Sequence, residues 1–245
     1  MLNKKKSSNS HIHIISHIVI TIAIFIFFAI ISGIIQLSYV LTKANWSLEK
    51  AMNILNENIY YGIETGSILG SYFSIIIICI LIEYVYKENI YTYLKLNKPP
   101  IKKTLGYLGI FIFWLITISF LAEKLNIKPL SEGADFAKSL ITTETNIVYL
   151  FIAIGIIQPI FEEVLFRGFL FEHLERKWGG FITILITSIT FSIVHFQYNF
   201  FILFLVLFPM AALLGYSRWK TKSLLPAIII HCINNSLTLL ITIYS

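Results

Sequence analysis

Long runs of apolar residues, separated by shorter polar connectors, dominate the hydrophobic pattern of this 245-residue chain. A helix needs about 20 mostly apolar residues to cross a bilayer, and runs of about that length recur along the sequence. The pattern therefore predicts an all-α, polytopic integral membrane protein with about seven transmembrane helices. The predicted spans cover about 14–40, 67–86, 105–122, 146–176, 180–197, 199–217 and 223–243.

The first run and the longer connectors add detail to this prediction. Lysines at positions 4–6 precede the run 14–40, as in a signal peptide, but a signal core is only about 7–15 residues long. We interpret 14–40 as a retained first helix. The connectors 41–66 and 123–145 are polar and long enough for short surface helices. We expect residues 1–145 to form three spans and residues 146–245 a four-helix catalytic core, within one integrated membrane domain.

Composition and charge support a membrane protein and exclude other classes. The chain is 57% hydrophobic and 13% charged, whereas soluble domains are about 45–50% apolar and 25% charged. With the N-terminus in the cytoplasm, most of the 19 Lys and Arg residues lie in cytoplasmic connectors, as the positive-inside rule requires. This distribution explains the net charge of +6 without a nucleic-acid partner. It predicts a multi-pass protein of the cell (plasma) membrane.

The fourth run carries charges at or near lipid depth. Glu162, Glu163 and Arg167 lie within it, and each charge costs about 2.5–3.5 kcal/mol at the centre of a membrane helix. Glu163 and Arg167 are spaced i,i+4 and are predicted to form a supporting ion pair. Glu162 has no evident partner on its own helix, which makes it a functional candidate. Pro159, one turn earlier, is expected to kink the helix.

Three more polar residues lie on later apolar runs. Counting at 1.5 Å per residue from the cytoplasmic connectors places His195, His231 and Asn235 at heights similar to that of Glu162. His231 and Asn235 are four residues apart and should share one helix face, whereas Asn234 should be turned aside. The sequence therefore predicts a buried polar active site built from three separate helices.

These residue types suit acyl hydrolysis. Glu162, with His195, could deprotonate a water molecule, and His231 and Asn235 could donate hydrogen bonds to an oxyanion. No Gly-x-Ser-x-Gly elbow and no His-Glu-x-x-His motif is present, and Cys232 lies within an apolar run, which does not activate a thiol. Glu and His are also zinc ligands. We nevertheless predict no metal and no cofactor.

The chain also resembles a known family. The segments Glu162-Glu163-Val-Leu-Phe-Arg167-Gly168, Phe191-x-x-x-His195 and His231-x-x-x-Asn235 are similar to the three motifs of the CPBP intramembrane proteases, the CAAX prenyl protease and bacteriocin-processing (Abi) group. The resemblance covers about residues 146–240. It implies a glutamate-dependent, metal-independent endopeptidase. Glu162 would then be the base and His195 its partner, His231 and Asn235 would form the oxyanion hole, and Glu163 and Arg167 would support the site.

A second class of function stays open on the sequence. Intramembrane Glu, His and Asn also suit a non-catalytic membrane protein, either a bacteriocin self-immunity factor or a proton-coupled transporter. For the protease, the expected partner is a peptide or protein substrate at the membrane. A prenylated CAAX tail, a leader peptide and a signal-peptide precursor are all compatible with the sequence, which specifies neither the substrate nor the oligomeric state.

Overall fold

The structure, a computed structural model, describes residues 2–57, 59–125, 138–141 and 146–244, with the backbone alone for residues 2–15. Every regular element in these ranges is a helix, and six helices are long and apolar enough to cross a membrane. This confirms the predicted all-α, polytopic class. The six are α1 (Leu2–Lys43), α3 (Ile63–Ile80) with η1 (Leu81–Val85), α5 (Ile101–Lys124), the run Ile147–Val194, the run Phe200–Thr221 and α12 (Leu225–Tyr244).

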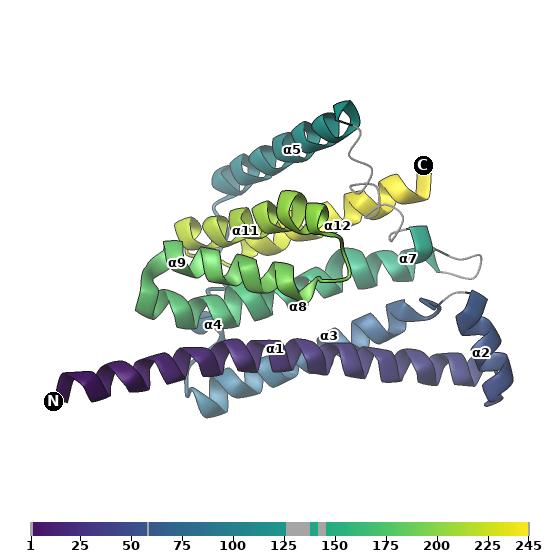
Figure 1. Ribbon diagram of the computed structural model, residues 1–245, viewed down its shortest axis with the longest axis horizontal. Helices are drawn as coiled ribbons and strands as arrows, with labels where there is room; N and C mark the ends of the chain where they lie inside the picture. The colour runs from purple at the N-terminus through teal and green to yellow at the C-terminus, as the bar shows by residue number, and fades with distance from the viewer. Residues whose placement is uncertain (1, 58, 126–137, 142–145, 245) are drawn as a thin grey trace.

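The fourth of these helices contains two of the predicted spans. It comprises α7 (Ile147–Leu150), η3 (Phe151–Ile157), α8 (Gln158–Glu163), η4 (Val164–Leu170) and α9 (Phe171–Val194). Gly179 interrupts it, with φ 70° and ψ 172°, a conformation that favours glycine. The chain reverses there, so that most of α9 runs back alongside α8 (Figure 1). The seven predicted runs thus correspond to six helices, one of them folded into a hairpin.

The remaining elements pack around this hairpin. The fifth helix comprises α10 (Phe200–Ile202), η5 (Leu203–Leu207) and α11 (Phe208–Thr221), and α11 packs against both α9 and α12. Short helices lie in the described parts of the connectors, among them α2 (Leu48–Glu57) and α4 (Ile90–Tyr93). Most of the connector 123–145, and the side chains of the lysines at positions 4–6, lie outside the described residues.

Small residues bring α1 and α3 together. The two helices lie side by side along one edge of the bundle (Figure 1). Gly66 of α3 is so close to α1 that an added Cβ would be 2.4 Å from the backbone oxygen of Ser32. Ser67, Ser71 and Ser74 of α3 are buried as well. In a bilayer, where apolar side chains gain little by leaving lipid, such close backbone approach is a main source of helix association.

We expect Gly66→Leu to destabilise this pair. The side chain would meet a backbone carbonyl, which cannot rotate aside, so the helices must separate, at a cost of about 1–3 kcal/mol. Gly33→Leu is the matched control because Gly33, on α1, is exposed and has no atom within 4 Å of an added Cβ. Thermal unfolding in detergent should show a lower midpoint for Gly66→Leu alone. Equal midpoints for the two variants would contradict the close packing of α1 and α3.

An aromatic core surrounds η4. Phe161, Phe166, Phe169 and Phe191 are all 0–1% exposed. The same apolar cluster extends to helices of the N-terminal half through buried residues of α1, α3 and α5; these are Ile24, Phe28, Ile78 and Phe111. The helices that precede the fourth span therefore pack directly against the segment that carries the charged residues.

Candidate active site

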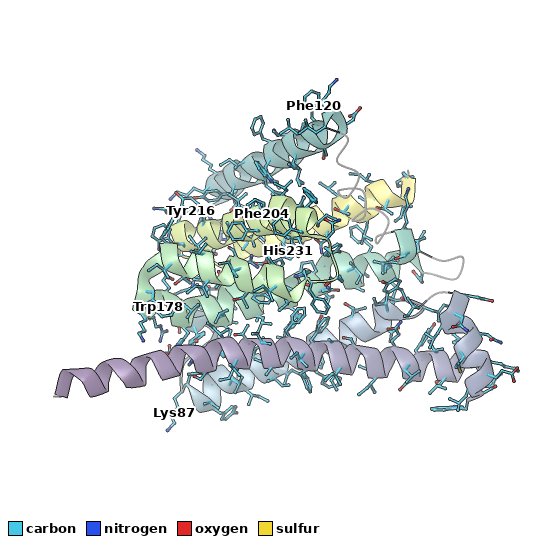
Figure 2. The ribbon with its side chains drawn as sticks, in the orientation of Figure 1. Lys87, Phe120, Trp178, Phe204, Tyr216 and His231 are labelled. Atoms are coloured by element: carbon cyan, nitrogen blue, oxygen red, sulfur yellow. The ribbon has the colours of Figure 1, made fainter. Side chains whose placement is uncertain are left out.

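The structure brings together the polar residues that the sequence singled out. Glu162 and Glu163 end α8, His195 follows the last residue of α9, and His231 lies on α12. Glu162 Oε2 is 4.0 Å from His195 Nε2 and 3.8 Å from His231 Nε2. Both Glu162 and His231 are 2% exposed. The predicted meeting of these three segments is confirmed, and Figure 2 shows His231 in the interior of the bundle.

Glu163 forms the ionic centre of the cluster. Its Oε1 accepts hydrogen bonds from Arg167 NH1 at 2.8 Å and from His231 Nδ1 at 2.9 Å. Arg167 also donates to the carbonyl of Ala211 on α11 at 3.0 Å and lies over the ring of Phe191. Because Glu163 and Arg167 are fully buried, each charge depends on the other. The predicted ion pair is confirmed, but its bond to His231 was not anticipated.

The prediction that Glu162 has no partner on its own helix was wrong. Gln158 Nε2, one turn earlier, donates to Glu162 Oε1 at 2.9 Å. Gln158 Oε1 in turn accepts from Ser67 Oγ of α3 at 3.0 Å. The i,i+4 spacing of Gln158 and Glu162 was visible in the sequence, because an amide and a carboxylate one turn apart can pair. The contribution of Ser67 was not, since 91 residues separate it from Gln158.

The second ring nitrogen of each histidine has a defined partner. His195 Nδ1 is 2.8 Å from the carbonyl oxygen of Phe191. A carbonyl can only accept, so Nδ1 carries a proton and the neutral ring presents a lone pair at Nε2. The bond of His231 Nδ1 to the Glu163 carboxylate fixes the orientation of that ring. Both rings thus direct Nε2 toward Glu162.

Asn235 lines a cavity that also reaches Glu162, and it contacts the π-helical part of the fourth helix. The π-helical η3 ends one residue before Gln158, and Pro159 comes next. Pro159 lacks a backbone N–H donor. Asn235 Nδ2 donates to the carbonyl of Ile154 at 3.2 Å, in this same π-helical stretch. Asn235 Oδ1 accepts from Asn234 Nδ2 at 3.0 Å. Asn234 also lines the cavity, so the prediction that it is turned aside was wrong.

A cavity of about 530 Å³ opens onto Glu162. Most of its wall is apolar and comes from many helices, including Phe25 and Phe28 of α1, Leu115 of α5 and Met210 of α11. Tyr198, in the connector after His195, contributes a polar group to the wall. Burial raises the pKa of Tyr198 to about 12, with a smaller contribution from the negative charge of Glu162. The phenol is therefore protonated at neutral pH.

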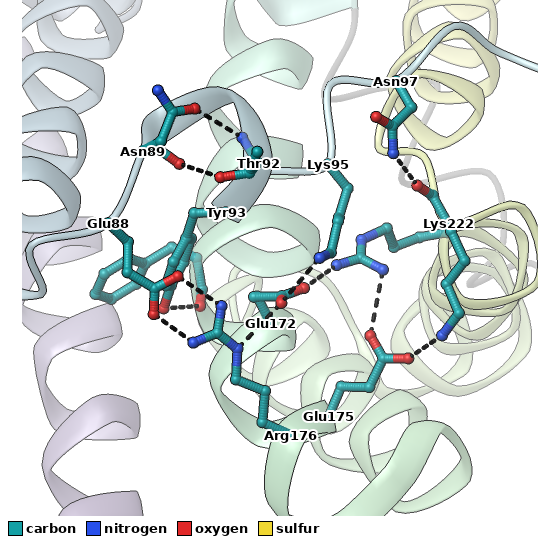
Figure 3. A network of polar contacts seen from close by, with 12 residues as sticks. Glu88, Asn89, Thr92, Tyr93, Lys95, Asn97, Glu172, Glu175, Arg176 and Lys222 are labelled. Carbon is teal, nitrogen blue, oxygen red and sulfur yellow. Dashed lines mark hydrogen bonds and ion pairs between the residues drawn. The ribbon is translucent and has the colours of Figure 1, made fainter.

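A second ionic cluster fixes the end of the bundle at which the fourth helix reverses (Figure 3). Glu172, 4% exposed, accepts from Arg218 NH2 at 2.6 Å and from Arg176 Nε at 3.1 Å, and it pairs with Lys95. Glu175 bonds Arg218 and Lys222. These contacts join the start of α9 to the end of α11 and to the connector after α4. The cluster thereby anchors the hairpin that carries Glu162 on one arm and His195 after the other.

Glu88 gives this cluster a predictable pH dependence. A hydrogen bond from Arg176 lowers the pKa of Glu88 below its ordinary value of 4.5. The ionised carboxylate of Glu88 thus stabilises the fold above pH 4.5. This stabilisation is lost as the pH falls through the lowered pKa. We expect the unfolding midpoint of the wild type to fall more steeply below pH 4.5 than that of Glu88→Gln. Parallel pH profiles of the two midpoints would contradict this contribution.

The fold and the site define a class: a multi-pass helical membrane protein with a buried carboxylate–histidine cluster beside an apolar cavity. Residues 144–237 match the family model described as type II CAAX prenyl endopeptidase Rce1-like, so this part of the chain is similar to that family. The resemblance inferred from the three motifs is thereby confirmed. No curated protein and no solved structure matches the chain. Within the described residues, no group of three or more His, Cys, Asp or Glu could hold a metal ion.

Proposed function

We propose that the protein is an intramembrane endopeptidase in which Glu162 activates water to hydrolyse a peptide bond. The observation that carries the proposal is the convergence of His195 Nε2 and His231 Nε2 on Glu162 Oε2, at 4.0 and 3.8 Å. These separations exceed a direct hydrogen bond. A water molecule among the three atoms could hydrogen-bond to each of them, next to a cavity large enough for substrate side chains.

The proposed reaction begins with proton transfer from this water to Glu162 Oε2. The neutral His195, whose Nε2 is an acceptor, helps to orient the water. The water oxygen attacks the carbonyl carbon of the substrate and forms a tetrahedral intermediate. Glu162 then passes its proton to the amide nitrogen as the carbon–nitrogen bond breaks, which releases a carboxylic acid and an amine.

The negative oxygen of the intermediate needs hydrogen-bond donors. We assign one donor to His231, which is held by Glu163 at Nδ1. With a hydrogen on each ring nitrogen, it donates from Nε2 to the oxyanion. Asn235 uses one amide hydrogen on Ile154 and keeps a second for the same oxygen. One such donor contributes about 2.7–4 kcal/mol to transition-state stabilisation.

The substrate we propose is a membrane-associated peptide or protein, because the cavity wall is mainly apolar. We further propose a plasma-membrane protein with a cytoplasmic N-terminus. In that orientation the ionic cluster around Glu172 lies on the cytoplasmic side, among the basic connectors, as the positive-inside rule favours.

Comparative peptidomics tests this function. Cells that produce the wild type should contain shortened membrane peptides that stay full-length in cells producing equal amounts of Glu162→Gln. The cleaved sequences would also identify the substrate. If the two strains yield the same peptides at equal membrane abundance of the protein, the proposal fails.

A further inference from the structure

A chain of hydrogen bonds reaches Glu162 from α3. Ser67 Oγ donates to Gln158 Oε1 at 3.0 Å, and Gln158 Nε2 donates to Glu162 Oε1 at 2.9 Å. We propose that Gln158 and Ser67 are positioning residues that orient the Glu162 carboxylate. This inference rests on the proposed role of Glu162 as the base, and it adds a role for residues to which no function is assigned by the three motifs.

The chemistry of the three side chains determines which group donates and which accepts in each of these hydrogen bonds. An ionised carboxylate only accepts hydrogen bonds, so Gln158 must present its NH₂ group to Glu162. The carbonyl oxygen of the amide then faces α3, where it needs a donor. The hydroxyl of Ser67 supplies it. Ser67 therefore disfavours the flipped amide, in which Gln158 would present an oxygen to the carboxylate.

The two carboxylate oxygens of Glu162 have different contacts. Oε1 is held by Gln158, whereas Oε2 faces His195 and His231. Fixing Oε1 restricts rotation about the last bond of the Glu162 side chain. Oε2 is then kept where both Nε2 atoms point, which is the position required for a base that accepts a proton from a water held there.

The residues of this hydrogen-bond chain are shielded from solvent to a large extent. Ser67 and Glu162 are each 2% exposed, and Gln158 is half-buried beside the cavity. Ser67 lies next to Gly66, where α3 is held tightly against α1. It also lies outside residues 144–237, the part that matches the family model. An N-terminal span thus contributes directly to the orientation of the proposed base.

Loss of the Gln158 donor should act on kcat. Without it, Oε1 of Glu162 is no longer held, and Oε2 is less often in the position that accepts a proton from the water. Looser positioning should lower kcat per folded molecule by about 10-fold or more, with a smaller change in KM. A purely structural role would lower the amount of folded protein without lowering kcat per folded molecule.

The test measures kcat and KM for cleavage of one identified peptide, per folded molecule, by the full-length protein in liposomes. The variants are Gln158→Leu, Ser67→Ala and the double variant, with Glu162→Gln in parallel. Ser71→Ala is the matched control, because Ser71 is also buried on α3, one turn further along, and its hydroxyl has no hydrogen-bond partner. Ser67→Ala removes only one oxygen, so it keeps the test valid if Gln158→Leu folds poorly.

We expect kcat per folded molecule to fall in Gln158→Leu and, by a smaller factor, in Ser67→Ala, and to stay unchanged in Ser71→Ala. The double variant should match Gln158→Leu, because Ser67 acts through Gln158. Inactive Glu162→Gln together with an unchanged kcat per folded molecule in the Gln158 and Ser67 variants would overturn the positioning role alone. Active Glu162→Gln would instead overturn the proposed function.

Discussion

Replacing Glu162 with Gln is expected to lower the rate of peptide cleavage by about 10²–10⁴-fold, the usual contribution of a positioned general base. The amide cannot accept a proton from water, although it has nearly the size of the carboxylate. The fold should tolerate the change, because Glu162 is 2% exposed and its charge is costly there. We therefore expect unchanged membrane abundance and an unfolding midpoint at least equal to that of the wild type.

Glu162→Asp provides the control for charge. It keeps a carboxylate but withdraws it by one methylene from His195 and His231, so part of the activity should remain. A wild-type rate for Glu162→Gln would show that this side chain is not the base. A low rate that accompanies loss of folded protein would place Glu162 among structural residues.

Replacing Arg167 with Met is expected to destabilise the protein by about 3–5 kcal/mol, because it leaves Glu163 as a buried charge without its ionic partner. Both side chains are fully buried and 2.8 Å apart. The variant also loses the bond to the Ala211 carbonyl, which joins η4 to α11. Membrane abundance and the unfolding midpoint in detergent should both fall sharply.

The double variant Glu163→Gln, Arg167→Met separates charge from packing. The amide introduced by Glu163→Gln is neutral, and its oxygen could still accept a hydrogen bond from His231. We expect a midpoint well above that of Arg167→Met alone. If the two variants unfold at the same temperature, the isolated charge is not the cause of the instability.

Much of the fold could be predicted from the sequence because the bilayer imposes simple rules. The length of each apolar run set the spans, and the distribution of Lys and Arg organised the connectors. The reversal at Gly179 was predicted only as a gap between two runs. Its conformation, with φ 70°, follows from the packing of α9 back against the same helix. The ionic anchor around Glu172 could not be predicted, since it joins segments that are distant along the chain.

The site was predictable where contacts are local or set by depth. The pair of Glu163 and Arg167 follows from i,i+4 spacing, and counting residues from the connectors brought His195 and His231 to the height of Glu162. Depth and spacing do not determine the rotation of α12 about its axis. For that reason neither the bond of His231 to Glu163 nor the position of Asn234 on the cavity was predicted.

The residues that line the cavity wall could not be predicted from the sequence either. Phe25 and Phe28 of α1 line it, although their sequence context is simply that of an apolar span. An apolar residue that faces lipid cannot be distinguished from one that faces a substrate by composition alone. The N-terminal helices, outside the segment 144–237 that matches the family, therefore gain a structural connection to the site only from the three-dimensional arrangement.

The central claim is that Glu162, without a metal, activates the water that cleaves the substrate. The most direct measurement is a single-turnover time course of an identified peptide in liposomes, after chelator treatment, for the wild type and Glu162→Gln side by side. We predict that the chelator leaves the wild-type rate unchanged and that Glu162→Gln forms almost no product. Cleavage by Glu162→Gln at the wild-type rate, or chelator inhibition that added zinc reverses, would contradict the account.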